Sequence, residues 1–582
     1  MTGKLIRRML AAQVLSAMTV SLCLLIDNVI INRFLGVQAV AAYELASPVL
    51  LAIGAAASIL ALGVQVACSK SLGSGSQEET NKGYSTAIAM GLSVSIFFTV
   101  LVFLFRGAIA SALGANSSPE LFAQTKDYLA GFVIGAVPTM TALSLLPFLQ
   151  MAGKSTLLII AVLGMTVTDV VLDLLNVHVF GMGMLGMGLA SSISYYVAMG
   201  IALTYFLSKK CVFRFSRSLI SRKKAAELIR GGMPGAFTSL SGVVLIFVLN
   251  HLLMGSGGET AVAAYAIVSG ILNTSNSVST GMNGVTLTLT GILFSEEDRG
   301  GLESILKRLL RYGLILGAGA AAVFAAFAPA IVGIFIQDEG AVRDMAVLGV
   351  RLTSLGLLPC CIVNVVKSFY QGTERIRQME IIGVLECAVL PTIAALILAW
   401  IAGTDGIWLY FVVGELLTLL CVFVYGLAQR RRGENPVLPS SFGILPGDAM
   451  EEEITDMNAA MEVSRKAEAF CLKHAQDETF ARRIALCIEE MAGNTVTHGF
   501  RKGRDNHLYV RVQCKGDQWI LRFRDDCVAF DPVKYIPGGE DEGEGLGIRL
   551  VMGMAEDVRY TYSLNLNNLT IMMKNRHGAG KS

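Results

Sequence analysis

The pentapeptide AVAAY at Ala39 to Tyr43 decides the fold, because it returns unchanged at Ala261 to Tyr265, 222 positions later. Both copies lie inside long apolar stretches. A second pair keeps almost the same offset, since FLQ at residues 148–150 is matched by FYQ at residues 369–371, displaced by 221 positions. An offset kept over so long a span indicates a duplicated bundle, and internal repeats of this kind build many polytopic membrane proteins.

Composition supports a membrane protein, although only for part of the chain. Hydrophobic residues make up 53% and charged residues 16% of the 582 residues, and the mean hydropathy is +0.59. These values exceed what a soluble core needs and exclude a purely soluble protein. After Arg432 the charge density becomes that of an ordinary globular domain. We therefore predict a linker rich in proline and glycine at residues 429–450 and a soluble domain at residues 451–582.

The cysteines and the net charge indicate neither a metal site nor a nucleic-acid partner. The eleven cysteines are scattered and form no C-x-x-C pair. We interpret them as small buried hydrophobic residues rather than ligands or disulfides. The net charge is only +2, and we expect no nucleic acid to bind.

Twelve apolar segments reach the roughly 20 residues that a membrane-spanning helix needs. The first six lie near residues 9–34, 41–68, 84–106, 128–150, 157–180 and 183–207. The second six lie near residues 236–254, 260–294, 310–336, 345–370, 378–401 and 405–428. Six spans per half make both halves enter the membrane in the same direction, so a pseudo-two-fold axis along the membrane normal should relate them. We predict an all-α bundle of an N-lobe (1–207), a basic connection (208–235) and a C-lobe (236–428).

Basic residues predict the orientation of the bundle. Lysines and arginines gather before the first span, in the central connection and after the last span, while the alternate loops have few. With twelve spans these three segments lie on one side of the membrane, and the positive-inside rule assigns that side to the cytoplasm. We therefore expect a multi-pass protein of the plasma membrane with both termini in the cytoplasm. The first span continues into Asp27 without a cleavage site, so we interpret it as an uncleaved helix.

Acidic residues inside predicted spans are costly and therefore informative. Asp27 lies in the first span, and Asp169 and Asp173 lie four residues apart in the fifth, on one helix face. If Asp27 faces the other two, all three cannot ionise cheaply, because desolvation and like charge both oppose it. Such a cluster would hold protons or a small cation. The alternative is a buried hydrogen-bonded network with no role in transport.

Other polar residues in the spans are weaker candidates. Ser191 could add a hydroxyl ligand and Asn176 an amide, although either could serve helix packing alone. In the second half Glu386 and Glu415 are single acids that could line a cavity or pair locally. The repeat offset maps Asp27 onto Leu249 rather than onto an acid. We therefore predict that the N-lobe couples the ion and that the C-lobe mainly shapes the substrate cavity.

The first 430 residues resemble the MATE (multidrug and toxic compound extrusion) transporters. The resemblance rests on residues 27–48, on the loop SLGSG at residues 71–75, on D-V-V-L-D at Asp169 to Asp173, and on residues 183–194. It implies antiport of amphipathic organic cations driven by an H+ or Na+ gradient, with Asp27 and Asp173 as coupling carboxylates. Asp169 stands where the family usually has Asn, and Ser191 where it has Thr. The wider superfamily also includes flippases of lipid-linked substrates, so that alternative stays open.

The soluble domain contains an ordered set of three motifs. A helical pattern over residues 464–499 ends in Glu490, Asn494 and His498, whose spacing of four would stack them on one face. Two strand-like segments, 508–514 and 518–523, follow and lead into Asp525. The sequence GEGLGI at residues 543–548 then begins another helical segment, where glycines would let backbone amides approach phosphate.

These motifs resemble the ATP-binding fold of the GHKL family, an α/β sandwich, and within it the anti-sigma-factor serine kinases. The resemblance implies Glu490 as general base, Asn494 as the Mg2+ ligand, Asp525 as the adenine-reading acid, and Gly545 and Gly547 as phosphate-loop glycines. Residues 532–543 would form the lid over ATP. The glycines expected two and four residues after Asp525 are missing, and Gly543 and Glu544 stand where an arginine is usual. These departures favour nucleotide binding over kinase activity.

Together these features predict a cation-coupled exporter in a lipid bilayer, with a tail that binds nucleotide or a cytoplasmic regulatory protein. One alternative is a membrane-anchored serine kinase or anti-sigma-like regulator whose membrane part senses a small molecule. Another is a degenerate tail that serves only as a docking or stability module.

Overall fold

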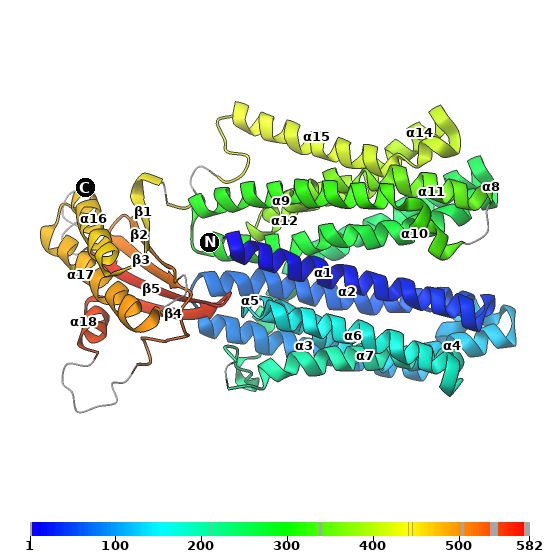
Figure 1. The fold of residues 1–582 in the computed structure, drawn as a ribbon, viewed down its shortest axis with the longest axis horizontal. Helices are drawn as coiled ribbons and strands as arrows, with labels where there is room; N and C mark the ends of the chain where they lie inside the picture. Colours follow the sequence, from blue (N-terminus) through cyan, green and yellow to red (C-terminus); the bar gives the residue numbers. More distant parts are fainter. Residues whose placement is uncertain are drawn as a thin grey trace.

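The structure is a computed structural model that describes residues 3–209, 211–336, 340–439, 442–444, 446–501, 506–535 and 545–575. A long helical bundle carries a smaller α/β domain at one end (Figure 1). The N-terminus and the end of α15 lie at that same end of the bundle. We call it the tail-side end.

The N-lobe consists of helices linked by short turns. Its helices are α1 (Gly3–Ile30), α2 (Val37–Gly73), α3 (Gln77–Ala112), α4 (Pro119–Val133), α5 (Ala136–Met151), α6 (Ser155–Leu175) and α7 (Gly183–Phe206), with π-helical turns η1 (Ile31–Leu35) and η3 (Asn176–Phe180). Serine side chains cap two of them, since Ser76 accepts a hydrogen bond from the Glu79 amide and Ser118 from the Leu121 amide. These caps satisfy amides that the first helical turn leaves free.

The C-lobe repeats this pattern. Its helices are α8 (Arg222–Ser295), α9 (Arg299–Ala326), α10 (Ala328–Phe335), α11 (Ala341–Ser354), α12 (Leu357–Gly372), α13 (Ile376–Val384), α14 (Leu390–Ile407) and α15 (Tyr410–Arg431), with the π-helical turn η5 (Leu385–Val389) between α13 and α14. Helix α8 contains two predicted spans, separated at Gly258 by a non-helical backbone with φ 66°. A positive φ of this size suits glycine.

All twelve predicted spans lie in helical segments of the structure. Among the described residues, eight helices are long and apolar enough to cross a membrane, or ten when the bent pairs α4–α5 and α11–α12 each count as one. The two bends of 45° and 44° break the spans predicted near residues 128–150 and 345–370. Sequence hydropathy could not locate these bends, because apolar residues continue through them.

The two lobes pack closely through glycines along their tail-side halves. A Cβ on Gly281 of α8 would lie 2.6 Å from the Val14 Cα of α1, and one on Gly291 would lie 2.2 Å from the Ser69 hydroxyl of α2. Lys70 at the end of α2 also forms an ion pair with Glu374, just after α12. These contacts hold the lobes together at the tail-side end.

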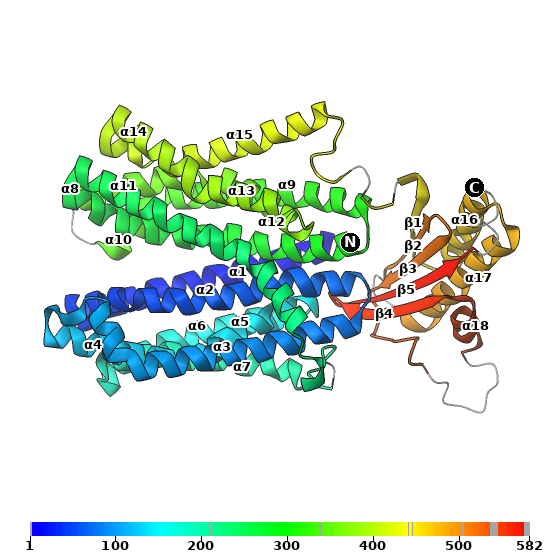
Figure 2. The ribbon, with the colours of Figure 1, turned by 180° about the vertical axis from the view of Figure 1, so that it is seen from behind.

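The tail domain has one antiparallel sheet with helices on one face (Figures 1 and 2). The strands, β1 (Ala449–Ile454), β2 (Leu508–Lys515), β3 (Gln518–Asp525), β4 (Asp557–Ser563) and β5 (Leu566–Lys574), are ordered β1-β2-β3-β5-β4. The helices are α16 (Met457–Ala475), α17 (Glu478–Asn494) and α18 (Leu546–Met554). Trp519 and Phe480 pack edge to face in the core between the two layers.

The structure confirms the two predicted strands but corrects the single helical pattern over residues 464–499. The helix ends at Ala475, where Gln476 adopts a left-handed conformation with φ 52°, and a new helix begins with Asp477 capping the Phe480 amide. The hydrophobic period continues through the break because both helices pack on the same sheet.

Candidate functional site

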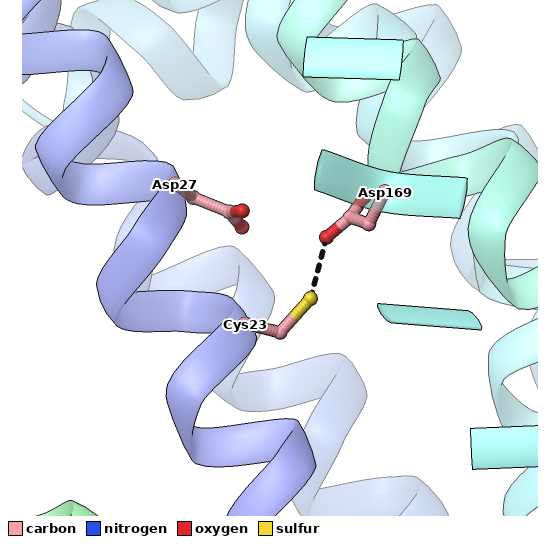
Figure 3. A group of neighbouring side chains, drawn as sticks. All are labelled: Cys23, Asp27 and Asp169. Carbon is pink, nitrogen blue, oxygen red and sulfur yellow. Dashed lines mark hydrogen bonds between the residues drawn. The ribbon is translucent and has the colours of Figure 1, made fainter. Parts of the chain in front are cut away.

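The N-lobe acids meet between α1 and α6. Asp27 and Asp169 are 5% and 3% exposed, and Asp173, one turn further along α6, is fully buried. Figure 3 shows Asp27 and Asp169 pointing toward each other across the gap between their helices, with the Cys23 thiol beside them. One ligand atom from each of these three side chains lies within 4.8 Å of the others. The cluster therefore has the size of a small-cation site.

The hydrogen bonding of this N-lobe cluster is incomplete. The Cys23 thiol donates to the Asp169 Oδ2 at 2.8 Å. Asp27 Oδ1, Asp169 Oδ1 and both oxygens of Asp173 accept no hydrogen bond from the part of the chain that the structure describes. Buried polar atoms are normally satisfied, so these oxygens are available to a proton or a cation.

Ser191 and Asn176, the two other N-lobe candidates, are both buried. Ser191 is 8% exposed on α7, and its carbonyl accepts a hydrogen bond from the Ser194 hydroxyl. The Asn176 amide instead donates to the Gly183 carbonyl at 2.9 Å and accepts from the Met182 amide at 3.1 Å. Asn176 thereby fastens the turn between α6 and α7, which is a structural role.

The C-lobe holds a second buried cluster. Glu386 of η5 and Glu415 of α15 lie with Cys360 of α12 so that one ligand atom of each is within 4.8 Å of the others. Lys367, also on α12, forms an ion pair with Glu386, and Asn364 donates to the other Glu386 oxygen at 2.9 Å. All of the carboxylates in this cluster are buried, with Glu415 2% exposed.

Lys367 and Cys23 belong to these clusters but were not predicted, although the position of each in the sequence was informative. Lys367 is a cation inside the predicted span 345–370, and an ionisable residue there needs a partner as much as an acid does. Cys23 precedes Asp27 by four positions and therefore shares its helix face. The C-lobe thus has an ionisable cluster of its own, formed at positions unrelated by the repeat offset.

In the tail, the candidate catalytic acid lies beside the candidate phosphate loop. A Cβ on Gly547, in the first turn of α18, would lie 1.9 Å from the Glu490 Oε2, so the Glu490 carboxylate lies directly against this glycine. Gly545 precedes the helix with φ 74°. The structure therefore brings together Glu490, Gly545 and Gly547 from two helices, with Asn494 one turn beyond Glu490 at the end of α17.

Asp525 lies at the end of β3 and is 8% exposed. Its Oδ1 accepts hydrogen bonds from the Asn567 amide at 2.7 Å and from the Cys527 backbone N–H at 3.0 Å. Burial raises the pKa of this carboxyl, although the hydrogen bonds from Asn567 and Cys527 work in the opposite direction. A cavity of about 170 Å³ is lined in part by Asp526 and Cys527, which directly follow Asp525, and by Asn565.

His498 does not continue the α17 face, because residues Thr495–Gly499 form a π-helical turn (η7), which is wider than an α-helical turn. The predicted lid at residues 532–543 lies mostly outside the described residues, as do Gly543 and Glu544.

Comparison with known proteins agrees with both parts of the chain. Residues 13–175 and 234–397 match the MatE family, and residues 455–574 match the histidine kinase-like ATPase domain. The multidrug export protein MepA of Staphylococcus saprophyticus is 23% identical over 407 residues, which cover 69% of this chain and 89% of that protein. MepA of Staphylococcus aureus is 23% identical over 399 residues, covering 67% and 86%.

Solved structures show the same bundle. A crystal structure of MATE in complex with MaL6 superposes with a TM-score of 0.68 at 20% identity, over 74% of this chain and 96% of that one. An outward-facing multidrug resistance MATE transporter of the MOP superfamily gives a TM-score of 0.67 at 20% identity, over 74% and 96%. The matched segments of the MatE family together cover more than half of the sequence. The chain therefore belongs to the MatE family, the multidrug and toxic compound extrusion transporters, and carries a histidine kinase-like ATPase domain at its C-terminal end.

Proposed function

We propose that this chain exports amphipathic organic cations across the plasma membrane in exchange for H+ or Na+, and that Asp27, Asp169 and Asp173 bind the coupling cation. The observation that carries this proposal is the convergence of buried carboxylate oxygens without hydrogen-bond donors, among the described residues, at the α1–α6 contact. The basic segments of the sequence support placing the tail-side end in the cytoplasm.

The chemistry follows from the cost of charge in a low-dielectric site. Three carboxylates cannot all remain ionised beside one another without a bound cation or proton. Entry of that cation from the outer side neutralises the cluster, and its departure on the tail side restores the charge. A cationic substrate binds best in the arrangement of the lobes in which the cluster is negatively charged. The coupling cation and the substrate are therefore bound in turn.

Reconstitution in liposomes tests this coupling. Transport of a fluorescent organic cation is measured under an imposed proton gradient and, separately, under an imposed sodium gradient, which identifies the ion. We expect Asp27→Asn and Asp173→Asn to abolish gradient-driven uptake while leaving substrate binding measurable. Asp127→Asn on α4 is the matched control, because Asp127 is exposed. Undiminished gradient-driven transport in both cluster variants would refute the assignment.

The tail is proposed to bind an adenine nucleotide with Mg2+, and not to power transport. The approach of Glu490 to Gly547, next to the start of α18, supports this, because an open helix N-terminus with glycine accommodates phosphate. Calorimetry on the full-length protein in detergent is the direct test. We expect Glu490→Ala and Asn494→Ala to weaken binding of Mg-ATP, and Asp517→Asn, at an exposed turn, to leave it intact.

A further inference from the structure

The turn between β4 and β5 is unusual, because a leucine adopts a left-handed backbone there. Ser563 pairs with Leu566, which leaves Leu564 and Asn565 as a two-residue turn with φ 55° and 64°. Such turns normally use Asn and Gly. A leucine in this conformation is strained and persists only where its surroundings compensate. The compensation lies in burial, since Leu564 is 2% exposed.

Leu564 is buried against the transporter and not in the tail's own core. Its side chain belongs to a cluster with Ile6 and Met9 of α1 and Phe369 of α12. Its backbone N–H donates to the Met151 carbonyl at the end of α5 at 2.6 Å. The turn therefore bonds to the end of the N-lobe helix α5 and packs in an apolar cluster that residues of both lobes form. The turn that joins β4 and β5 lies at the tail-side end of the bundle in both views (Figures 1 and 2).

The close fit of this turn requires a glycine in the N-lobe. A Cβ on Gly153, which follows α5, would lie 2.4 Å from the Asn565 backbone nitrogen. Gly153 has φ 72°. Strand β4, which leads into the turn, makes a second contact with the N-lobe, because the Arg559 guanidinium donates to the Ser74 carbonyl at 3.1 Å.

A set of ion pairs fastens the same sheet to the C-lobe. The acids are three consecutive residues between α8 and α9, and the bases project from the sheet face opposite its helices. The pairs are Glu296 with Arg522 and Arg524, Glu297 with Lys515, and Asp298 with Arg511. Gln513 and Ile520 on this face are 0% and 8% exposed, so the docked face is buried.

The docked turn is also joined to the candidate nucleotide site. Asn567, three residues after Leu564, donates to the Asp525 carboxylate, and its own carbonyl oxygen accepts from the Tyr560 hydroxyl at 2.6 Å. Tyr562 and Asn565 line the same cavity as Asp526 and Cys527. A nucleotide base that occupies this cavity and bonds to Asp525 therefore lies next to the turn and beside the Asn567 amide, which holds one Asp525 oxygen.

We propose that the β4–β5 turn is a latch that keeps the two lobes closed at the tail-side end, and that an adenine nucleotide at Asp525 releases it. The release rests on the nucleotide binding proposed above. In MATE-like bundles alternating access is a rocking of one lobe against the other. Opening at the tail side separates the end of α5 from the α8–α9 connection. The tail sheet then cannot keep both the hydrogen bond from Leu564 to Met151 and its ion pairs with the acids at residues 296–298. The latch thus makes different contacts in the two states, which is the requirement for biasing one of them.

Hydrogen exchange on the full-length protein in lipid nanodiscs tests the latch directly. Amides of residues 148–154 and 560–568 are followed with and without a non-hydrolysable Mg-ATP analogue. We expect nucleotide to raise their exchange by roughly fivefold or more, the lower range of allosteric couplings. Leu564→Asn should raise exchange without nucleotide, because Asn keeps the turn but loses the buried side chain. Leu472→Asn on α16, 45% exposed, is the matched control and should change neither segment.

The outcomes separate the latch from the nucleotide proposal. If calorimetry shows nucleotide binding but exchange at residues 148–154 stays unchanged, the release is wrong. If Leu564→Asn leaves both exchange and transport rate at parental values, the latch is wrong. Absence of nucleotide binding overturns the release and the tail's proposed function, whereas the Leu564→Asn comparison still decides whether the latch exists. Asn567→Ala should weaken the response to nucleotide while keeping the turn docked.

Discussion

Lys367 of α12 and Glu386 of η5 form an ion pair inside the C-lobe, with both side chains less than a tenth exposed. The pair adjoins Glu415, one of whose oxygens has no hydrogen-bond partner among the described residues. The ammonium group of Lys367 therefore supplies a positive charge to a site that contains two acids. The N-lobe cluster has no corresponding base among the described residues around it, so the two lobes balance buried charge differently.

Removing one partner of this pair should cost more than removing both. Lys367→Met leaves Glu386 and Glu415 without a counter-charge, and breaking a buried pair costs roughly 3–5 kcal/mol. The double variant Lys367→Met/Glu386→Gln should recover most of this loss. The apparent thermal midpoint in detergent is the measurement. A double variant less stable than Lys367→Met would contradict the pairing.

Gly186 should tolerate no side chain, whereas Gly200 on the same helix should. A Cβ on Gly186 would lie 1.9 Å from the Asn176 Oδ1, but one on Gly200 meets nothing within 4 Å. We expect Gly186→Ala to destabilise the N-lobe by roughly 1–3 kcal/mol through overpacking. Gly200→Ala should be neutral or slightly stabilising, because alanine favours helix. Equal thermal midpoints for the two variants would show that the Asn176 turn does not require close packing.

Asp525→Asn should stabilise the tail and abolish nucleotide binding. The raised pKa of Asp525 means that its charged form is disfavoured in the folded state. The stabilisation associated with its protonated form is present below the unfolded pKa of about 3.9 and is lost as pH rises through the folded pKa. The Asp525→Asn variant avoids this loss. Its free energy of unfolding should therefore exceed that of the parent most near pH 7, and the difference should fade toward pH 4. Unfolding of the tail followed across this pH range, with calorimetry at pH 7, checks both parts.

Charge reversal should test the ion pair between Lys515 of the tail and Glu297 of the bundle. These side chains are 53% and 40% exposed, so the pair is worth roughly 0.2–1 kcal/mol. Lys515→Glu alone should raise hydrogen exchange at the α8–α9 connection, and adding Glu297→Lys should restore protection. Lys466→Glu breaks an ion pair within the tail, with Glu452, and serves as the control. The contact is absent in solution if the double variant exchanges as fast as Lys515→Glu.

Helices and strands were the most predictable part of the structure. The twelve apolar segments all became helical, because membrane-length hydrophobic sequence must satisfy its backbone internally. Strands β2 and β3 followed from alternation, but β1, β4 and β5 were not predicted. The acidic segment of β1 lacks that alternation, and the last two strands contain many polar residues on both faces.

Individual site residues were predictable where burial alone made them unusual. Asp27, Asp169 and Asp173 were identified because an acid in an apolar span is costly. Their meeting with Cys23, and the pairing of Lys367 with Glu386, depend on how separate helices rotate against each other. Hydropathy carries no information on that rotation.

The sequence by itself determined that this protein is a duplicated membrane bundle with a soluble tail. The repeat offset, the hydropathy and the order of the motifs can all be read from the chain without knowing which residues touch. Only the tertiary structure decided what the tail touches. Nothing in the sequence distinguishes Leu564, Arg511 or Asp298. Their role comes from the contacts of Leu564 with Met151 and of Arg511 with Asp298, which join segments more than 200 residues apart. Such contacts arise from shape and charge complementarity of folded surfaces, which no local pattern encodes.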